Sequence, residues 1–256
     1  MPDYKNPPIQ EAICEFTFEP LPGEPEWDLT LPGRLQLNAD LKEYAGKSRQ
    51  QILREIVAGD RNEPEVGVRQ RLFRIHLPTK DGKALLSLGH NVLGVVSLKP
   101  YEGWNDFQPR ILRALAAFVQ ESGLTQVKRL GIRYINRIIV PELEASKGSE
   151  YIVGMQTMVK ASCDDGEHVK AKLTALNTRH EFITVDSVKV FVTQGTMNPE
   201  KVGTSEYLLD IDCVHDHKQI AGVDKIDPVL ERLHAIEGAI FESFITDKTR
   251  MLFNAG

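Results

Sequence analysis

The sequence has few cysteines, and none of them are paired at a metal-binding spacing. Its 256 residues contain three cysteines, Cys14, Cys163 and Cys213, which are far apart in the chain. Scattered cysteines, odd in number and without a Cys-x-x-Cys pair, indicate neither a disulfide framework nor a structural zinc site. We therefore expect no bound metal. We also expect Cys14 to be an inert apolar side chain in the core.

Long apolar runs are also missing. No stretch approaches the roughly 20 residues that a membrane-spanning helix needs. The N-terminal residues MPDYKNPPIQ have neither the basic start nor the apolar segment of a secretory signal. The sequence thus predicts a cytoplasmic protein without a membrane partner.

Motifs of the common catalytic sites are absent. The chain has no Gly-x-Ser-x-Gly elbow, no Walker A loop, no Gly-x-Gly-x-x-Gly after a strand and no His-Glu-x-x-His. We therefore expect no cofactor, and the sequence leans away from an enzyme. A net charge of −5 argues against strong general binding to nucleic acid.

The composition is that of an ordinary globular protein, with 41% hydrophobic and 26% charged residues. At this length, the chain can bury a substantial core as one compact unit, residues 1–256. A polar stretch, 142–150, is the place where a boundary would divide it into halves 1–141 and 150–256.

Alternating apolar and polar residues predict strands through most of the chain, and helical spacing predicts a smaller number of helices. The mixed order of these elements favours an α+β fold, in which a curved, mostly antiparallel sheet packs against two or three helices. We expect strands at 9–18, 68–77, 84–88, 91–98, 127–140, 151–160, 168–176, 187–194 and 207–214. Helices are expected from Pro32 or Gly33 to Gly46, at 49–57, from Trp104 to Ser122, and as a long C-terminal helix that begins at Asp227 and Pro228.

Four stretches resemble a sporadically distributed family of uncharacterised bacterial proteins of about this length. They are NPPIQEAICEF at 6–16, YEGWNDF at 101–107, LGIRYINRI at 130–138 and ITDK at 245–248. The resemblance implies one fold along the whole chain, but it does not supply an activity. A sporadic distribution also implies a mobile-element or bacterial defence setting.

A row of arginines on the longest predicted strand is the first candidate site. Alternation places Arg129, Arg133 and Arg137 on one face, about 13 Å apart per step, and Asn136 on the other face with apolar residues. With Arg69 and Arg71 of an earlier strand, the row could bind phosphates or an acidic partner. The simpler interpretation is ion pairing across the sheet with Glu11, Glu15 and Glu19 of the first strand.

Two acidic clusters are weaker candidates for a metal site. In the run from Asp210 to His217, Asp210 and Asp212 face one way, whereas Cys213 and His215 face the other, so these ligands cannot converge. The cluster around Gly166, residues 164–168, is typical of a polar turn. We also interpret Trp104 and Phe107 as core residues rather than a stacking platform.

These observations support two functional hypotheses. The first is a non-catalytic binding or interaction protein, for an unknown protein partner or a small anionic ligand, which could also form oligomers. The alternative is a phosphate- or nucleotide-handling enzyme with a charged, curved-sheet cavity. In that alternative Arg133 and Arg137 would hold the anion, Glu11 and Glu15 would hold a divalent metal, and Asn136 would complete the ligand-binding set.

Overall fold

A computed structural model of the protein describes residues 4–21, 27–58, 66–140, 175–200, 203–221 and 225–254. The side chains of 54–58, 66–71 and 217–221 lie outside this description. So do the predicted boundary at 142–150, the strand predicted at 151–160, most of the one predicted at 168–176, and the acidic cluster at 164–168. The side chains of Arg69 and Arg71 are outside it as well.

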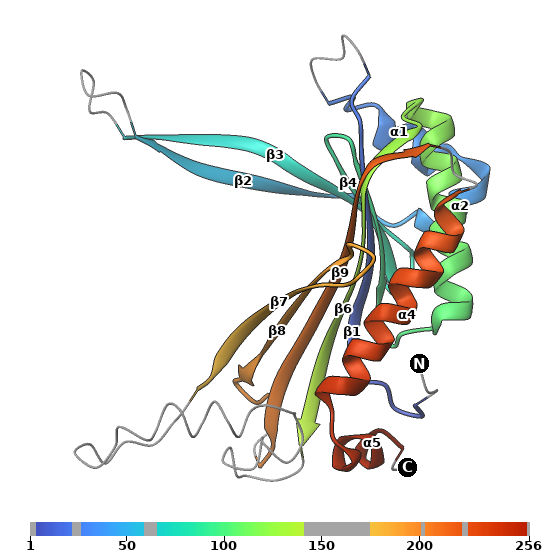
Figure 1. The fold of residues 1–256 in the computed structure, drawn as a ribbon. Coiled ribbons are helices and arrows are strands. Elements are labelled where there is room, and N and C mark those ends of the chain that lie inside the picture. Colours follow the sequence, from blue (N-terminus) through green and yellow to red (C-terminus); the bar gives the residue numbers. More distant parts are fainter. Residues whose placement is uncertain are drawn as a thin grey trace.

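The described strands form one antiparallel sheet, with strand order β2-β3-β4-β5-β1-β6-β9-β8-β7 (Figure 1). This confirms the α+β class, although the sheet is not strongly curled. Strands from both sides of residue 142 belong to it. The bounds are β1 Ile9–Phe18, β2 Arg49–Ala58, β3 Val66–Pro78, β4 Ala84–Gly89, β5 Val92–Leu98, β6 Gln126–Val140, β7 Asn177–Ile183, β8 Lys189–Met197 and β9 Ser205–Ala221.

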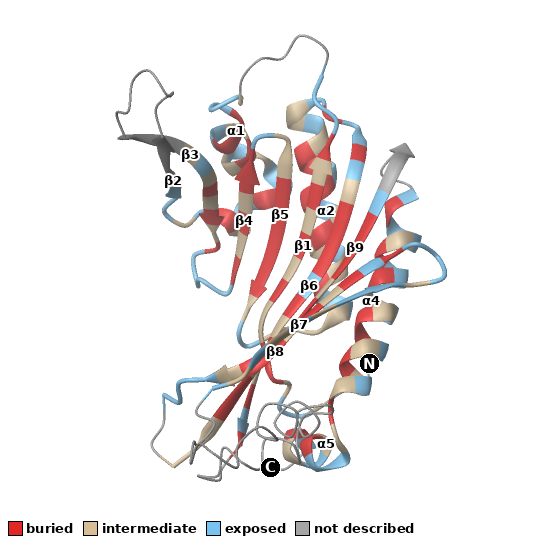
Figure 2. Ribbon diagram, turned by 60° about the vertical axis from the view of Figure 1, so that its left-hand side comes forward, coloured by how far each residue is buried: buried red, intermediate tan, exposed pale blue. Residues whose placement is uncertain are grey.

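Helices cover one face of the sheet, and the β2–β3 hairpin extends away from them (Figure 1). The helical elements are α1 Leu31–Leu37, the 3-10 helix η1 Ala39–Tyr44, α2 Trp104–Ser122, α4 Ile226–Phe244 and α5 Asp247–Asn254. In Figure 2 the sheet lies in front of α1, α2 and α4, and its other face is turned to the viewer. The main core therefore lies between the sheet and this single helix layer.

Alternation along the central strands decides which side chains enter that core. On β1, Ala12, Cys14, Phe16 and Phe18 are buried, as the sequence predicts. Burial also raises the pKa of the Cys14 thiol well above its ordinary value, which keeps it protonated. On β6, Leu130, Ile132, Tyr134, Asn136 and Ile138 are buried, whereas Arg133 lies on the opposite face.

Turn and cap residues bound several elements where the sequence places them. Gly82 has φ 71° between β3 and β4, as a tight hairpin at Asp81-Gly82 requires. Helix α2 spans the predicted residues, and Gly123, with φ 74°, ends it in the left-handed conformation.

Two helix predictions are corrected. Residues 49–57 form strand β2 rather than a helix, because they pair antiparallel with β3 from Arg49 opposite His76, with one register shift between Gln51 and Ile52. The first predicted helix is interrupted at Asn38, whose extended backbone (ψ 133°) separates α1 from η1 and whose side chain accepts a hydrogen bond from the Asp40 N–H.

Helix α4 is the long C-terminal helix, and it begins at Ile226, one residue before the predicted cap. Its stripe of Leu230, Leu233 and Phe241 is buried against β6 and β9, while Ile240 and Phe244 are half-buried at its edge. The packed stripe, rather than the helix's own propensity, holds α4 in place.

Phe241→Ala should lower the free energy of unfolding by about 3–5 kcal/mol, because it removes a buried aromatic ring and leaves a cavity. Leu37→Ala is the control, since Leu37 is 88% exposed and its truncation should change the free energy of unfolding by less than about 0.5 kcal/mol. Denaturant melts compare the two. A loss below about 1 kcal/mol for Phe241→Ala would show that α4 contributes little to the core.

Candidate functional site

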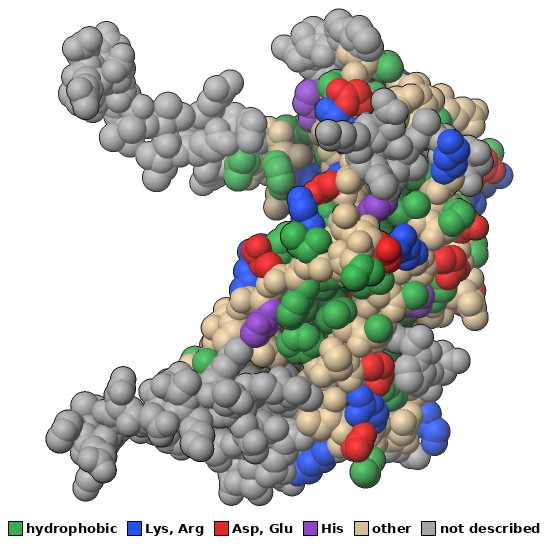
Figure 3. All heavy atoms as spheres, in the orientation of Figure 1, with side chains coloured by type: hydrophobic (Ala, Val, Ile, Leu, Met, Phe, Trp, Pro, Cys, Tyr) green, Lys and Arg blue, Asp and Glu red, His purple; other side chains and the backbone are tan. Residues whose placement is uncertain are grey.

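Carboxylates pair with every arginine of the β6 row. Arg133 Nη2 lies 2.6 Å from Asp210 Oδ2, and Arg137 Nη1 lies 2.8 Å from Glu200 Oε1. Arg137 Nε also donates to Glu206 Oε2 over 2.7 Å. On the molecular surface of Figure 3, acidic and basic side chains lie beside one another.

The third arginine, Arg129, lies 3.6 Å from Glu15 Oε1 and 3.8 Å from Asp216 Oδ1. Glu15 is also 2.9 Å from Arg74 of β3. Glu11 of β1 stands opposite Ile135 of β6. The hydrogen bond to Asp210 is the main cause of the raised pKa of Arg133, and the charge of Glu11 adds a smaller contribution.

The ion pairing was expected, but Arg133 and Arg137 pair with Asp210 and Glu206 of β9 rather than with carboxylates of β1, and Arg137 also pairs with Glu200, which precedes β9. In the β6–β9 register Arg133 stands opposite Asp212 and Arg137 opposite Leu208. Each arginine reaches the carboxylate two residues earlier on β9, a diagonal neighbour on the same face, which long side chains can contact. This register explains why β9 carries acidic residues, because Asp210 and Glu206 pair with the arginines of β6.

Burial separates these two ion pairs in energy. The Arg133 side chain is 44% exposed, so solvent screens its pair with Asp210, whereas Arg137 is 15% and Glu206 only 1% exposed. Removing Arg137 would leave a buried carboxylate without its cation, which is much more costly than breaking an exposed pair.

Arg137→Ala should therefore lower the free energy of unfolding by about 3 kcal/mol, and Arg133→Ala by about 1 kcal/mol or less. Urea melts of the two variants and of the parent protein measure both losses of unfolding free energy. Equal losses would contradict this ranking. No loss for Arg137→Ala would remove the structural role assigned to its pair.

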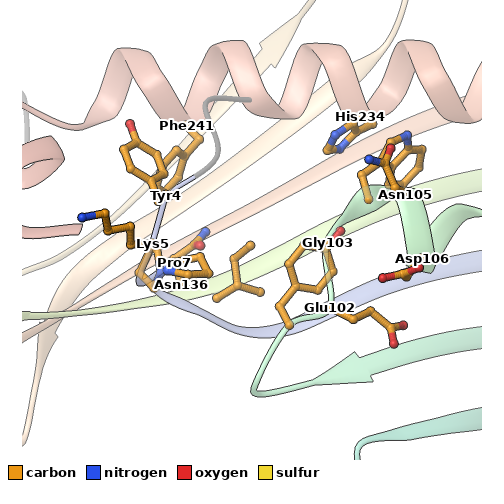
Figure 4. Close-up of a pocket in the computed structure, with 14 residues that line it drawn as sticks. Tyr4, Lys5, Pro7, Glu102, Gly103, Asn105, Asp106, Asn136, His234 and Phe241 are labelled. Atoms are coloured by element: carbon orange, nitrogen blue, oxygen red, sulfur yellow. The ribbon is translucent and has the colours of Figure 1, made fainter. Parts of the chain in front are cut away.

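A pocket of about 640 Å³ opens on the helix-covered side (Figure 4). Four separate parts of the chain build it: the segment leading into β1, the entry and first turn of α2, β6, and α4. Its lining residues are Tyr4, Lys5, Pro7, Pro8, Ile9, Tyr101, Glu102, Gly103, Trp104, Asn105, Asp106, Asn136, His234 and Phe241.

Specific contacts fix the N-terminal wall of this pocket. The Asn6 N–H donates to the Phe253 carbonyl of α5 over 3.0 Å, and the Pro8 carbonyl accepts from the Arg137 N–H over 2.9 Å. Tyr4 donates its hydroxyl proton to Glu242 over 2.6 Å, and burial, with Glu242, raises its pKa to about 12. The segment before β1 is thus tied to α4, α5 and β6.

Asn136 supplies a buried polar group to the pocket. Asn136 is only 1% exposed. Nδ2 donates to the carbonyls of Leu209 (3.1 Å) and Tyr134 (3.4 Å), which identifies that atom as the nitrogen. No donor among the described residues reaches Oδ1. A buried acceptor without a partner is costly, so Asn136 is a place where a ligand can supply a donor.

A chain of polar rings continues beside Asn136. Tyr101 Oη and Tyr134 Oη are 3.1 Å apart, and Tyr134 Oη lies 3.3 Å from His234 Nδ1. The His234 ring stacks on Trp104, with 4.0 Å between centroids. Burial lowers the pKa of His234 to about 4, so the ring is neutral at neutral pH.

Glu237 is a fully buried carboxyl group one helical turn from His234. Neither of its oxygens has a hydrogen-bond partner within the described part of the chain. Burial raises its pKa well above the ordinary glutamate value. The proton is therefore kept in the folded state, because an isolated buried carboxylate would be far more costly.

Glu237→Met should stabilise the protein more at high pH than at low pH. The folded-state pKa is raised, so Glu237 carries no titration penalty below the unfolded pKa of about 4.3, and stability is lost as pH rises above it. The stabilisation by the variant should therefore be larger at about pH 8 than at about pH 4.

Glu231→Met is the control for this comparison, since Glu231 is exposed on the same helix and its hydrogen bond from Trp104 Nε1 is lost at both pH values alike. Denaturant melts at both pH values give the two free-energy differences. A pH-independent effect of Glu237→Met would mean that the carboxyl is not held neutral by the fold.

The residues predicted as one site lie on opposite faces of the sheet. Arg133, Arg137, Glu11 and Glu15 lie on the face away from the helices, and Asn136 lines the pocket on the other face. Phe107 is buried as predicted, whereas Trp104 is only half-buried and lines the pocket.

His234 and Glu237 were not among the predicted site residues. Glu237 falls in the apolar stripe of α4, four residues after Leu233 and four before Phe241. A carboxylate at that position of a helical stripe is the signal that would have identified it.

No protein-family model matches the chain, and no curated protein matches it. The resemblance to the sporadically distributed bacterial family therefore stays a prediction.

Among the described residues, no three His, Cys, Asp or Glu side chains converge on a common point, and no helix there is both long and apolar enough to cross a membrane.

Proposed function

We propose that the protein is a non-catalytic binding protein that holds a small organic molecule in the pocket between the N-terminal segment, α2, β6 and α4. The observation that carries this proposal is Asn136 Oδ1, an acceptor without a partner in the described structure, at the wall of a pocket of about 640 Å³. Pockets of about this size are typical of small-molecule sites.

The protonation states of Tyr101, Tyr134 and His234 support binding rather than catalysis. Burial raises the pKa values of Tyr101 and Tyr134 above the ordinary tyrosine value, so both hydroxyls remain protonated. His234, with a pKa of about 4, is a weak base. Efficient general acid–base groups have a pKa near the working pH, and these three are far from it.

The charges on the face of the sheet away from the helices, here called the open face, favour a binding protein over a phosphate-handling enzyme. An anion there would compete with the carboxylates that already bind Arg129, Arg133 and Arg137. Glu15, proposed as a metal ligand in that alternative, is engaged by Arg74. A phosphate bound at this face would have to displace at least one of these ion pairs.

A ligand screen by nuclear magnetic resonance tests the proposal, with a library that spans cationic, neutral and anionic small molecules. Asn105→Trp places a large side chain on an exposed residue of the pocket mouth, and should abolish binding of the hits. Ala239→Trp, on the exposed side of α4, is the control and should leave binding unchanged. A screen without hits, or hits that Asn105→Trp does not affect, would refute the proposal.

A further inference from the structure

Hydrogen-bond acceptors without partners lie toward both ends of the pocket. Asn136 Oδ1 is one of them, and Glu102 Oε1, at the entry of α2, is buried and without a partner among the described residues. The other carboxylate oxygen of Glu102 accepts from Arg110 over 2.8 Å. A ligand that satisfies both ends must present hydrogen-bond donors at both, since buried acceptors are otherwise left unpaired.

The charge near Glu102 favours a positive group at that end. Asp106, in the first turn of α2, adds a second carboxylate to the lining. Arg110 offsets the charge of Glu102. The N-terminus of α2 contributes about half a positive charge, which the full charge of Asp106 still exceeds, so the balance at this end stays negative. Lys5 is the lining cation, and it lies at the opposite end from Glu102 and Asp106 (Figure 4).

Aromatic residues of the lining suit an apolar body that carries a cation. Tyr101 and Trp104 both line the pocket, and the Trp104 ring stacks on that of His234. Aromatic faces attract ammonium groups electrostatically, and more strongly where water is excluded. Because His234 is neutral, it does not repel such a group.

We infer that the ligand is a small organic amine, with its ammonium group at Glu102 and Asp106, its apolar part along Tyr101, and a second donor at Asn136 Oδ1. This inference rests on the proposed binding function and assigns a ligand class to the same pocket. Glu102 accepts a charge-assisted hydrogen bond, the stronger class of such bonds, so it contributes most to the selection of charge.

Four matched probes test the inference by isothermal titration calorimetry: tyramine, phenethylamine, para-ethylphenol and para-hydroxyphenylacetate. Tyramine should bind at least about tenfold more tightly than para-hydroxyphenylacetate, which replaces the ammonium group with a carboxylate, and than neutral para-ethylphenol. Phenethylamine lacks the hydroxyl that can donate to Asn136, and should bind about three- to tenfold more weakly than tyramine.

Glu102→Gln keeps the shape of the side chain and removes its charge. It should weaken tyramine about tenfold and leave para-ethylphenol within about twofold of the parent. Glu43→Gln is the control, because Glu43 contacts the same Arg110 but does not line this pocket. It should leave both affinities within about twofold.

Each other outcome overturns the inference. Tighter binding of the carboxylate or of the neutral phenol would refute an amine ligand and leave the proposed binding function intact. Absence of binding by all four probes would also refute it. The proposed function itself would fall only if the broader ligand screen also found no molecule sensitive to Asn105→Trp.

Discussion

The alternation of side chains along β6 is the constraint on which both faces of the molecule depend. The strand lies between β1 and β9, so its backbone groups are paired on both sides. One face must then be apolar enough to pack against the helices. On the other face, charged side chains that are partly buried must be paired with opposite charges. Tyr134 and Ile138 meet the first requirement, and the ion pairs of Arg133 and Arg137 meet the second.

Periodicity in the sequence was sufficient for the α+β class, the faces of β1 and β6, and the bounds of α2, because these features depend on local spacing and on cap residues. It could not give strand register, and register decides that Arg133 contacts Asp210. The β2 segment was misread because Gln, Arg and Glu favour helices, while pairing with β3 overrides that weak preference.

The candidate site was harder to predict for a different reason. The pocket combines segments more than 200 residues apart, from Tyr4 to Phe241, and no local pattern links them. Asn136 was predicted on the apolar face of β6, but it was grouped with the arginines in one ligand-binding set. Its role differs because adjacent residues of a strand point to opposite faces, so Asn136 and Arg137 serve different surfaces although they are consecutive.

That adjacency connects the two faces physically. Arg137 binds Glu206 across the β6–β9 pair, and Asn136 donates to the Leu209 carbonyl across the same pair. The Arg137 N–H also donates to the Pro8 carbonyl, which holds the N-terminal wall of the pocket. A shift of β9 against β6 would break the ion pair on one face and release the amide of Asn136 on the other. The ion pair of the open face therefore helps to hold Asn136 Oδ1 in position, and the rigidity of the pocket wall depends on charges that no pocket ligand contacts.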